Sequence, residues 1–270
     1  MPPHAAPLLT LHKAALARLR AYTPPPFPLY DTLPVSRRAA VLLLLFADRL
    51  GDLRVVITMR ATSLRNYSGH AALPGGKADN LTETPFQIAR REAYEEIGLP
   101  MDDARLPKPF RIEHLCRLPF NLAKTELAVA PCVAFLHSDG GSVEEQMIPR
   151  LDAKEVAAVF SAPFHNFLRS HDEVRPGGTE PPGGRGEWYK GAWTDWHEGR
   201  WRMHEFHVPV DEQVVTKPKV REGGQKSISD DFEEEREEVR RYKVWGMTAR
   251  ILVDAARVAY GEDPEFEVCF

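Results

Sequence analysis

The chain has 270 residues, enough for one well-buried domain or two small ones, and its 43% hydrophobic and 27% charged residues are ordinary for a globular protein. The formal net charge of −4 argues against an overall basic surface, so no nucleic-acid partner is expected. Three widely spaced cysteines suit neither a disulfide framework nor a zinc site, and no apolar run reaches the roughly 18–20 residues of a membrane span.

The N-terminal segment is predicted to form a helix over Leu8–Tyr22 that ends before Pro24-Pro25-Pro26. The first 30 residues lack acidic side chains and carry three basic ones, Lys13, Arg18 and Arg20. A mitochondrial presequence therefore stays open as an alternative to a plain helix. We treat residues 1–30 as a helix and proline-rich linker, and residues 31–265 as a single domain.

Three apolar runs predict strands. Ala39–Phe46 is typical of a buried strand, and Leu53–Met59 of its partner across a turn that contains Gly51. Further along, Leu127–Leu136 predicts another strand. In that run Pro131 indicates an edge position or a bulge, because proline cannot donate a ladder hydrogen bond.

The C-terminal half is predicted to alternate between ordered elements and loops. Ala153–Phe160 begins another element, and the glycine- and proline-rich stretch Arg175–Arg185 predicts a loop. The aromatic stretch Tyr189–Val210 predicts a hairpin, and the polar residues 211–240 predict a mobile loop. Val244–Tyr260 predicts a closing amphipathic helix.

A helix over Pro85–Ile97 has both of its ends marked in the sequence. Thr84 is a good N-cap, Pro85 suits the first helical position, and Gln87 can complete a capping box with Thr84. Gly98 is placed to end the helix as a C′ glycine.

Three carboxylates, those of Glu92, Glu95 and Glu96, share one face of this helix, since residues three and four apart are neighbours. An exposed acidic face would be the plain interpretation of such a trio alone. Here a double-glycine loop, Gly75-Gly76, precedes the helix, and glycines let the backbone approach a ligand closely. Clustered hard oxygens suit Mg²⁺ or Mn²⁺, which bridge to phosphate oxygens, so loop and helix together predict a site for a metal-bound diphosphate.

The stretch from Gly76 to Leu99 resembles the Nudix box, Gly-x5-Glu-x7-Arg-Glu-U-x-Glu-Glu-x-Gly-U, where U is a bulky aliphatic residue. The glutamates, the arginine and the last glycine fit, Ala93 is small at the first U, and six residues instead of five separate Gly76 from Glu83. The resemblance implies an α/β fold, the Nudix α/β/α sandwich with a mixed sheet between helices. To it we add the N-terminal helix and an insertion at about residues 170–240.

The residues before the box resemble the signature of the coenzyme A diphosphatase subfamily, Arg-[Ser/Ala]-x3-Arg-x3-Gly-x3-Phe-Pro-Gly-Gly. The stretch from Arg60 to Gly76 fits at every fixed position except Leu73, where Phe is usual. Trp245-Gly246-Met247-Thr248-Ala249 resembles the segment that opens the last helix of that subfamily. The implied reaction is hydrolysis of the diphosphate of coenzyme A or acyl-CoA to 3′,5′-ADP and (acyl-)4′-phosphopantetheine.

The resemblance assigns roles by position in the box. The implied ligands of Mg²⁺ or Mn²⁺ are Glu92, Glu95, Glu96 and the carbonyl of Gly76. The implied catalytic residues are Glu92, Glu96 and Glu83. Arg91 is expected to orient the glutamates by salt bridges. The general base stays open between Glu92, Glu96 and a loop residue, and Glu126 and Glu155 are downstream candidates.

The same resemblance implies six substrate-binding residues, namely Arg60, Arg65, Gly69, His70, Gly75 and Lys77. Arginine recognises phosphate bidentately, so Arg60 and Arg65 are assigned to the phosphates of coenzyme A. The aromatic residues between Trp188 and Trp201 can either stack an adenine or pack a hairpin.

Two alternative functions stay open: a Nudix hydrolase of another nucleoside diphosphate derivative, such as an oxidised dNTP, NADH or ADP-ribose, and a non-catalytic Nudix binding module. The intact glutamates argue against the second. A small-molecule substrate is expected, and a homodimer is left open. The expected compartment is intracellular, either the peroxisome or the cytoplasm, with the mitochondrion second; Val268-Cys269-Phe270 does not resemble the Ser-Lys-Leu peroxisomal address.

Overall fold

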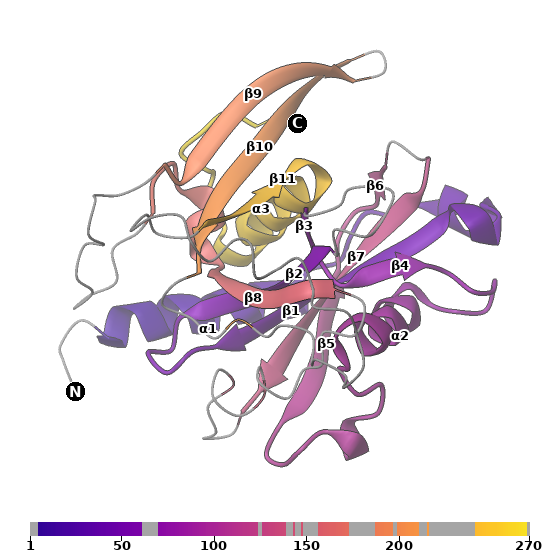
Figure 1. Ribbon diagram of the computed structural model, residues 1–270, viewed down its shortest axis with the longest axis horizontal. Helices are drawn as coiled ribbons and strands as arrows, with labels where there is room; N and C mark the ends of the chain where they lie inside the picture. The colour runs from indigo at the N-terminus through magenta and orange to yellow at the C-terminus, as the bar shows by residue number, and fades with distance from the viewer. Residues whose placement is uncertain are drawn as a thin grey trace, which may run out of the picture.

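The computed structural model describes residues 5–60, 70–123, 126–138, 143, 147, 156–172, 187–196, 199–210, 215 and 241–268. Within these ranges the chain forms an eight-stranded mixed sheet, a three-stranded sheet and three α-helices (Figure 1). Of the described helices, none is long and apolar enough to cross a bilayer.

Strand β1, Arg38–Ala47, lies at the centre of the large sheet. It pairs antiparallel with β2, Leu53–Arg60, which confirms the predicted hairpin. On its other side it runs parallel to β7, Ala128–His137, over nine residue pairs from Arg38↔Ala128 to Phe46↔Leu136. The sheet is therefore mixed, as predicted.

Shorter strands complete the large sheet. Beside β2 lie β3, Ala71–Ala72, and β8, Val156–Pro163, which is the described part of the element expected from Ala153. Strand β4, Gly75–Lys77, pairs with the beginning of β1. The remaining two, β5 (Arg111–Arg117) and β6 (Asn121–Leu122), pair with β7 and were not predicted. Short 3-10 helices lie at Pro28–Thr32, Val35–Arg37, Asp103–Arg105 and His165–Leu168.

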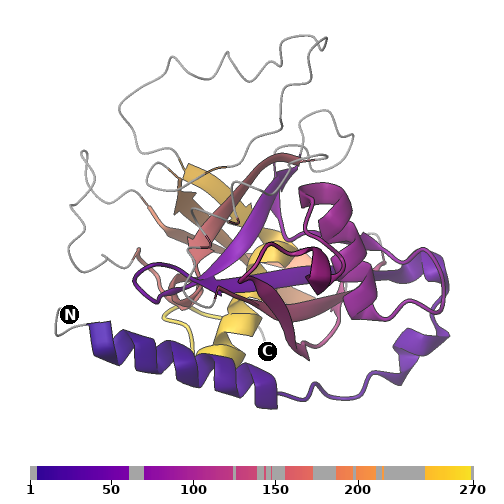
Figure 2. The ribbon, with the colours of Figure 1, turned by 90° about the horizontal axis from the view of Figure 1, so that it is seen from below.

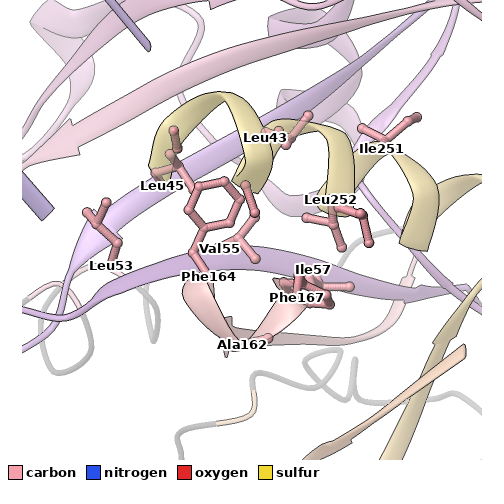
Figure 3. Close-up of a cluster of buried hydrophobic side chains, with 14 of the residues drawn as sticks. Leu43, Leu45, Leu53, Val55, Ile57, Ala162, Phe164, Phe167, Ile251 and Leu252 are labelled. Carbon is pink, nitrogen blue, oxygen red and sulfur yellow. The ribbon is translucent and has the colours of Figure 1, made fainter. Parts of the chain in front are cut away.

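The apolar run of β1 is continuous because both faces of the sheet are covered. Leu43 and Leu45 point into one core, whereas Leu42 and Leu44 point into the other, as the two-residue period of a strand requires. The second core lies under helix α2, Pro85–Ile97. The first lies under helix α3, Gly246–Tyr260 (Figure 3). The predicted α/β/α arrangement is thus confirmed.

The prediction that Pro131 marks an edge strand is wrong, because β7 lies between β1 and β5. The missing N–H is tolerated because β5 ends at Arg117, beside this position, and Leu118 N–H donates to the Pro131 carbonyl at 2.9 Å. An irregularity does occur nearby, but in the partner strand, where the register shifts between His114 and Cys116.

The predicted hairpin at Tyr189–Val210 is confirmed as β9, Tyr189–Trp196, and β10, Gly199–Pro209. A third strand, β11 (Arg241–Trp245), pairs antiparallel with β10. Consequently α3 begins at Gly246 and not at Val244, where its apolar pattern starts. The loops expected at Arg175–Arg185 and 211–240 lie outside the described residues, apart from Val215.

Helix α1, Ala5–Ala21, confirms the predicted N-terminal helix. It lies alongside α3 (Figure 2), and its Ala15 and Leu19 are fully buried in the core under α3. The His12 ring is hydrogen bonded to the Tyr260 hydroxyl at 3.1 Å and to Asp52 Oδ1 at 3.2 Å. These contacts fix α1 to both α3 and the β1–β2 turn.

Candidate active site

Helix α2 begins and ends where its sequence predicts. The Gln87 side chain accepts a hydrogen bond from Thr84 N–H at 2.8 Å, and the Thr84 hydroxyl oxygen accepts one from Gln87 N–H at 3.3 Å, which completes the capping box. Gly98 ends the helix with φ of 68°, a left-handed conformation that suits glycine. The three glutamates of the box are thereby held on a helix with two fixed ends.

The double-glycine loop packs against this helix without side chains. In β4, Gly75 lies opposite Val41 and Gly76 opposite Ala40. Gly75 N–H donates to Glu96 Oε2 at 3.0 Å. A Cβ atom at Gly76 would lie 2.4 Å from the carboxyl carbon of Glu92, so only glycine leaves room for that carboxylate. The glycines of the loop and the carboxylates of the helix therefore meet directly.

Arg91 connects the acidic residues to one another and to the loop. Its guanidinium donates to Glu83 Oε1 at 2.9 Å, to Glu92 Oε1 at 3.0 Å and to Glu95 Oε2 at 3.3 Å. A fourth bond, 2.7 Å long, reaches the Lys77 carbonyl. Arg91 thus makes the salt bridges that were expected of it.

Burial and charge act differently on the carboxyl groups. Burial raises the pKa of Glu92, and the hydrogen bond from Arg91 only partly opposes it. At Glu83 burial also favours the neutral acid, but hydrogen bonds from Arg91 and from the Asp79 and Asn80 amides prevail and lower the pKa. Asp79, to which the sequence analysis assigned no role, adds a 3.2 Å ion pair to Arg91. Glu83 is therefore an anion that braces the loop.

The donor set fits a hard divalent cation by its chemistry: three carboxylates on adjacent turns, one of them lodged against a glycine backbone. In the described part of the chain, however, no three acidic, His or Cys side chains converge as a ready ligand group. The reason is visible in the contacts, since Glu92 and Glu95 face Arg91 while Glu96 accepts from Gly75. Metal binding would require these carboxylates to reorient.

Of the six expected substrate-binding residues, Arg60, His70, Gly75 and Lys77 lie in the part of the chain that the structure describes. Arg60 ends β2, its N–H donates to the His70 carbonyl at 3.0 Å, and its buried Nε has no hydrogen-bond partner among the described residues. The His70 ring meets Trp245 edge to face, with centroids 5.0 Å apart. Lys77 is exposed. Arg65 and Gly69 lie outside the described residues.

The downstream base candidates gain no support. Glu126 has a positive φ of 60° and forms a 2.5 Å ion pair with Arg37. Glu155 lies outside the described residues. Trp245 lies next to the site through its contact with His70. It was assigned no role from the sequence, although the Trp-Gly-x-Thr-Ala pattern contains it.

Comparison with known proteins identifies the family to which these features correspond. The NUDIX domain family matches residues 36–177. A peroxisomal coenzyme A diphosphatase of Saccharomyces cerevisiae is 32% identical over 84% of the chain and 71% of its own length. Nudix hydrolase 22, chloroplastic, of Arabidopsis thaliana is 33% identical over 85% of the chain and 58% of its own length. A peroxisomal coenzyme A diphosphatase of Mus musculus is 31% identical over 52% of the chain and 51% of its own length.

Proposed function

This chain belongs to the Nudix family of hydrolases, and from that premise we propose that it cleaves the diphosphate linkage of coenzyme A or acyl-CoA. The products would be 3′,5′-ADP and (acyl-)4′-phosphopantetheine. The observation that carries the proposal is the direct contact between Gly75 and Glu96, because it joins the carboxylate helix to the segment in which the subfamily signature lies. The names of the yeast and mouse relatives support the choice of substrate.

We assign the divalent cation to Glu92, Glu95 and Glu96, with the Gly76 carbonyl as a fourth ligand. A bound Mg²⁺ or Mn²⁺ would neutralise the diphosphate and make a water molecule more acidic. The chain's own residues do the rest. Arg91 and Glu83 hold the ligand-bearing turn against the loop, and Glu92, Glu96 or a loop residue accepts the proton of the attacking water.

On the substrate side we assign phosphate recognition to Arg60 and Arg65, with Gly69, His70, Gly75 and Lys77 lining the approach. The buried Nε of Arg60, which has no partner among the described residues, supports this assignment, because a buried donor without a partner is costly unless a ligand accepts from it. Among the compartments left open, the names of the relatives favour the peroxisome.

The test is a substrate panel with the purified protein and Mg²⁺ or Mn²⁺: coenzyme A, acetyl-CoA, a long-chain acyl-CoA, 8-oxo-dGTP, ADP-ribose and NADH, with products identified by mass. We expect the highest kcat/KM for the coenzyme A species, with 3′,5′-ADP as a product. A higher kcat/KM for another diphosphate would retain the Nudix chemistry but reject the assignment of Arg60. No cleavage of any compound with either metal would favour the non-catalytic binding module.

A further inference from the structure

The three-stranded sheet has one buried and one outward face. Phe206, Val208 and Val244 point into the core with α3 and are fully buried. Because side chains alternate along a strand, Lys243 and Trp245 point to the opposite face. There Trp245 lies across from Glu205 on β10, and Lys243 from His207.

Strand β11 lies next to β3 (Figure 1). The end of β11 therefore brings this outward face to His70, which directly precedes β3. Trp245 contacts the His70 ring with centroids 5.0 Å apart, and Lys243 Nζ lies 5.3 Å from the centroid of the Trp245 ring. His70 in turn accepts from the backbone of Arg60. Two side chains of β11, Lys243 and Trp245, thereby lie beside His70, whose carbonyl binds the backbone of Arg60 at the end of β2.

The group lies within reach of the carboxylates on α2. Gly75 follows His70 by five positions in sequence, a span of at most about 18 Å, and Gly75 is hydrogen bonded to Glu96. A substrate whose diphosphate lies at the glutamates can therefore extend one of its arms to Lys243 and Trp245.

The chemistry of the group selects which arm. Arg60 and Lys243 supply two positive charges, and the neighbouring acid, Glu205, is paired with Lys243 at 3.3 Å. Cations suit a phosphomonoester, and an indole such as Trp245, which has the Lys243 ammonium over its ring, can stack a base once that ammonium moves to the phosphate. The pantetheine arm of coenzyme A has neither group, whereas the adenosine arm has both.

We infer that Lys243 and Trp245, together with Arg60, recognise the 3′-phosphorylated adenosine of the substrate and so distinguish coenzyme A from its dephospho form. The inference rests on the proposed function, since it assigns a role in binding the same substrate. Lys243 binds the 3′-phosphate after release from Glu205, and Trp245 provides the surface for the base.

Lys243→Met tests the phosphate contact. We expect kcat/KM for coenzyme A to fall about tenfold or more, as for the loss of one hydrogen bond to a charged group, with little change for dephospho-CoA. The matched control is Lys190→Met. Lys190 lies on β9, is 53% exposed against 49% for Lys243, and is likewise paired with a glutamate, at 2.6 Å from Glu187. Lys190→Met should leave the ratio of kcat/KM for coenzyme A to kcat/KM for dephospho-CoA unchanged.

Trp245→Phe and Trp245→Leu test the stacking contact by calorimetric binding of 3′,5′-ADP and 5′-AMP without metal. The phenylalanine variant should retain most of the affinity for both ligands. The leucine variant should bind both ligands about tenfold more weakly, which is the effect of losing one base–aromatic stack. Lys243→Met should weaken the binding of 3′,5′-ADP and leave the binding of 5′-AMP unchanged.

The outcomes separate the two proposals. If the wild type cleaves coenzyme A but Lys243→Met leaves its preference over dephospho-CoA intact, or lowers both rates equally, the inference fails and the proposed function stands. If the wild type cleaves no coenzyme A species, the proposed function fails. Tight metal-free binding of 3′,5′-ADP that Lys243→Met abolishes would then still support the recognition role.

Discussion

At the scale of single residues, the two glycines of the loop have different constraints. A Cβ atom at Gly75 would lie 2.3 Å from the Ala40 carbonyl oxygen and 2.6 Å from Val41 Cα, both backbone atoms of β1. At Gly76 the clash is with the end of the flexible Glu92 side chain. We therefore expect Gly75→Ala to destabilise the fold by about 1–3 kcal/mol, as overpacking does. Gly76→Ala should change stability by less than about 1 kcal/mol but lower kcat/KM at least about tenfold by displacing Glu92.

Urea unfolding and coenzyme A hydrolysis, measured on both variants, check this contrast. Equal losses of stability would show that Gly76 is also constrained by backbone packing. Full activity in a well-folded Gly76→Ala protein would mean that the position of Glu92 does not matter for turnover.

The residues of the box could be predicted from sequence because their spacing is local: Glu92, Glu95 and Glu96 share a helix face whatever the rest of the chain does. The contact of Gly75 with Glu96 follows from the same motif. The contact of His70 with Trp245 could not be predicted, because 174 intervening residues separate them and the contact forms where β11 packs beside β3. Asp79 was assigned no role from the sequence, because its ion pair with Arg91 depends on how the loop folds back onto α2.

At the scale of elements, α1 is fastened to the large sheet by an ion-pair cluster. Arg20 on α1 donates to both carboxylate oxygens of Glu113 on β5, at 2.6 and 2.8 Å, and His137 Nε2 lies 2.7 Å from the same group. The hydrogen bond from Arg20, with that from His137, outweighs burial and lowers the pKa of Glu113 to about 2. This carboxylate links the N-terminal helix to the edge strand.

Glu113→Gln should weaken that link in a pH-dependent way. A carboxyl pKa that is lower in the folded than in the unfolded state stabilises the fold above the unfolded value of about 4.3, and the contribution disappears as pH falls toward 2. We expect the variant to melt about 2–4 °C below the wild type at pH 7, corresponding to about 1 kcal/mol for a partly exposed pair. The difference in melting temperature should shrink between pH 4 and pH 3. A difference that stays constant to pH 3 would refute the role of the Glu113 charge.

Helix α2 was predicted to the residue because its capping box and its C′ glycine are local signals. Strand β5 was missed because its sequence, Arg111–Arg117, mixes charged and apolar residues and its register shifts at His114. The start of α3 was placed too early because Val244 and Trp245 extend the apolar pattern of the helix. Both residues belong to β11 because β11 pairs with β10, and no local sequence signal predicts this pairing.

At the scale of the whole molecule, the proposed site spans both layers of the sandwich. The carboxylates belong to α2, which covers one core, whereas Trp245 stands at the junction of β11 with α3, which covers the other. Strands β1 and β2 separate these cores and also carry the loop partner Val41 and the substrate residue Arg60. The geometry of the site therefore depends on the packing of the entire sheet.

Because a metal ion would bind the folded chain and not the unfolded one, its binding should be visible as global stability without any substrate. At a concentration 100 times its Kd, Mg²⁺ adds about 2.7 kcal/mol to the free energy of unfolding, which raises the melting temperature by about 5–10 °C for a domain of this size. Chelation with EDTA should reverse the shift. Glu92→Gln should remove most of the shift, and the amide oxygen can still accept from Arg91, so the metal-free variant should melt within a few degrees of the wild type. Glu126→Gln is the matched control, since it alters an acid paired with Arg37 away from the box and should keep the full shift. A Glu92→Gln protein that Mg²⁺ and Mn²⁺ stabilise as fully as the wild type would place the metal elsewhere.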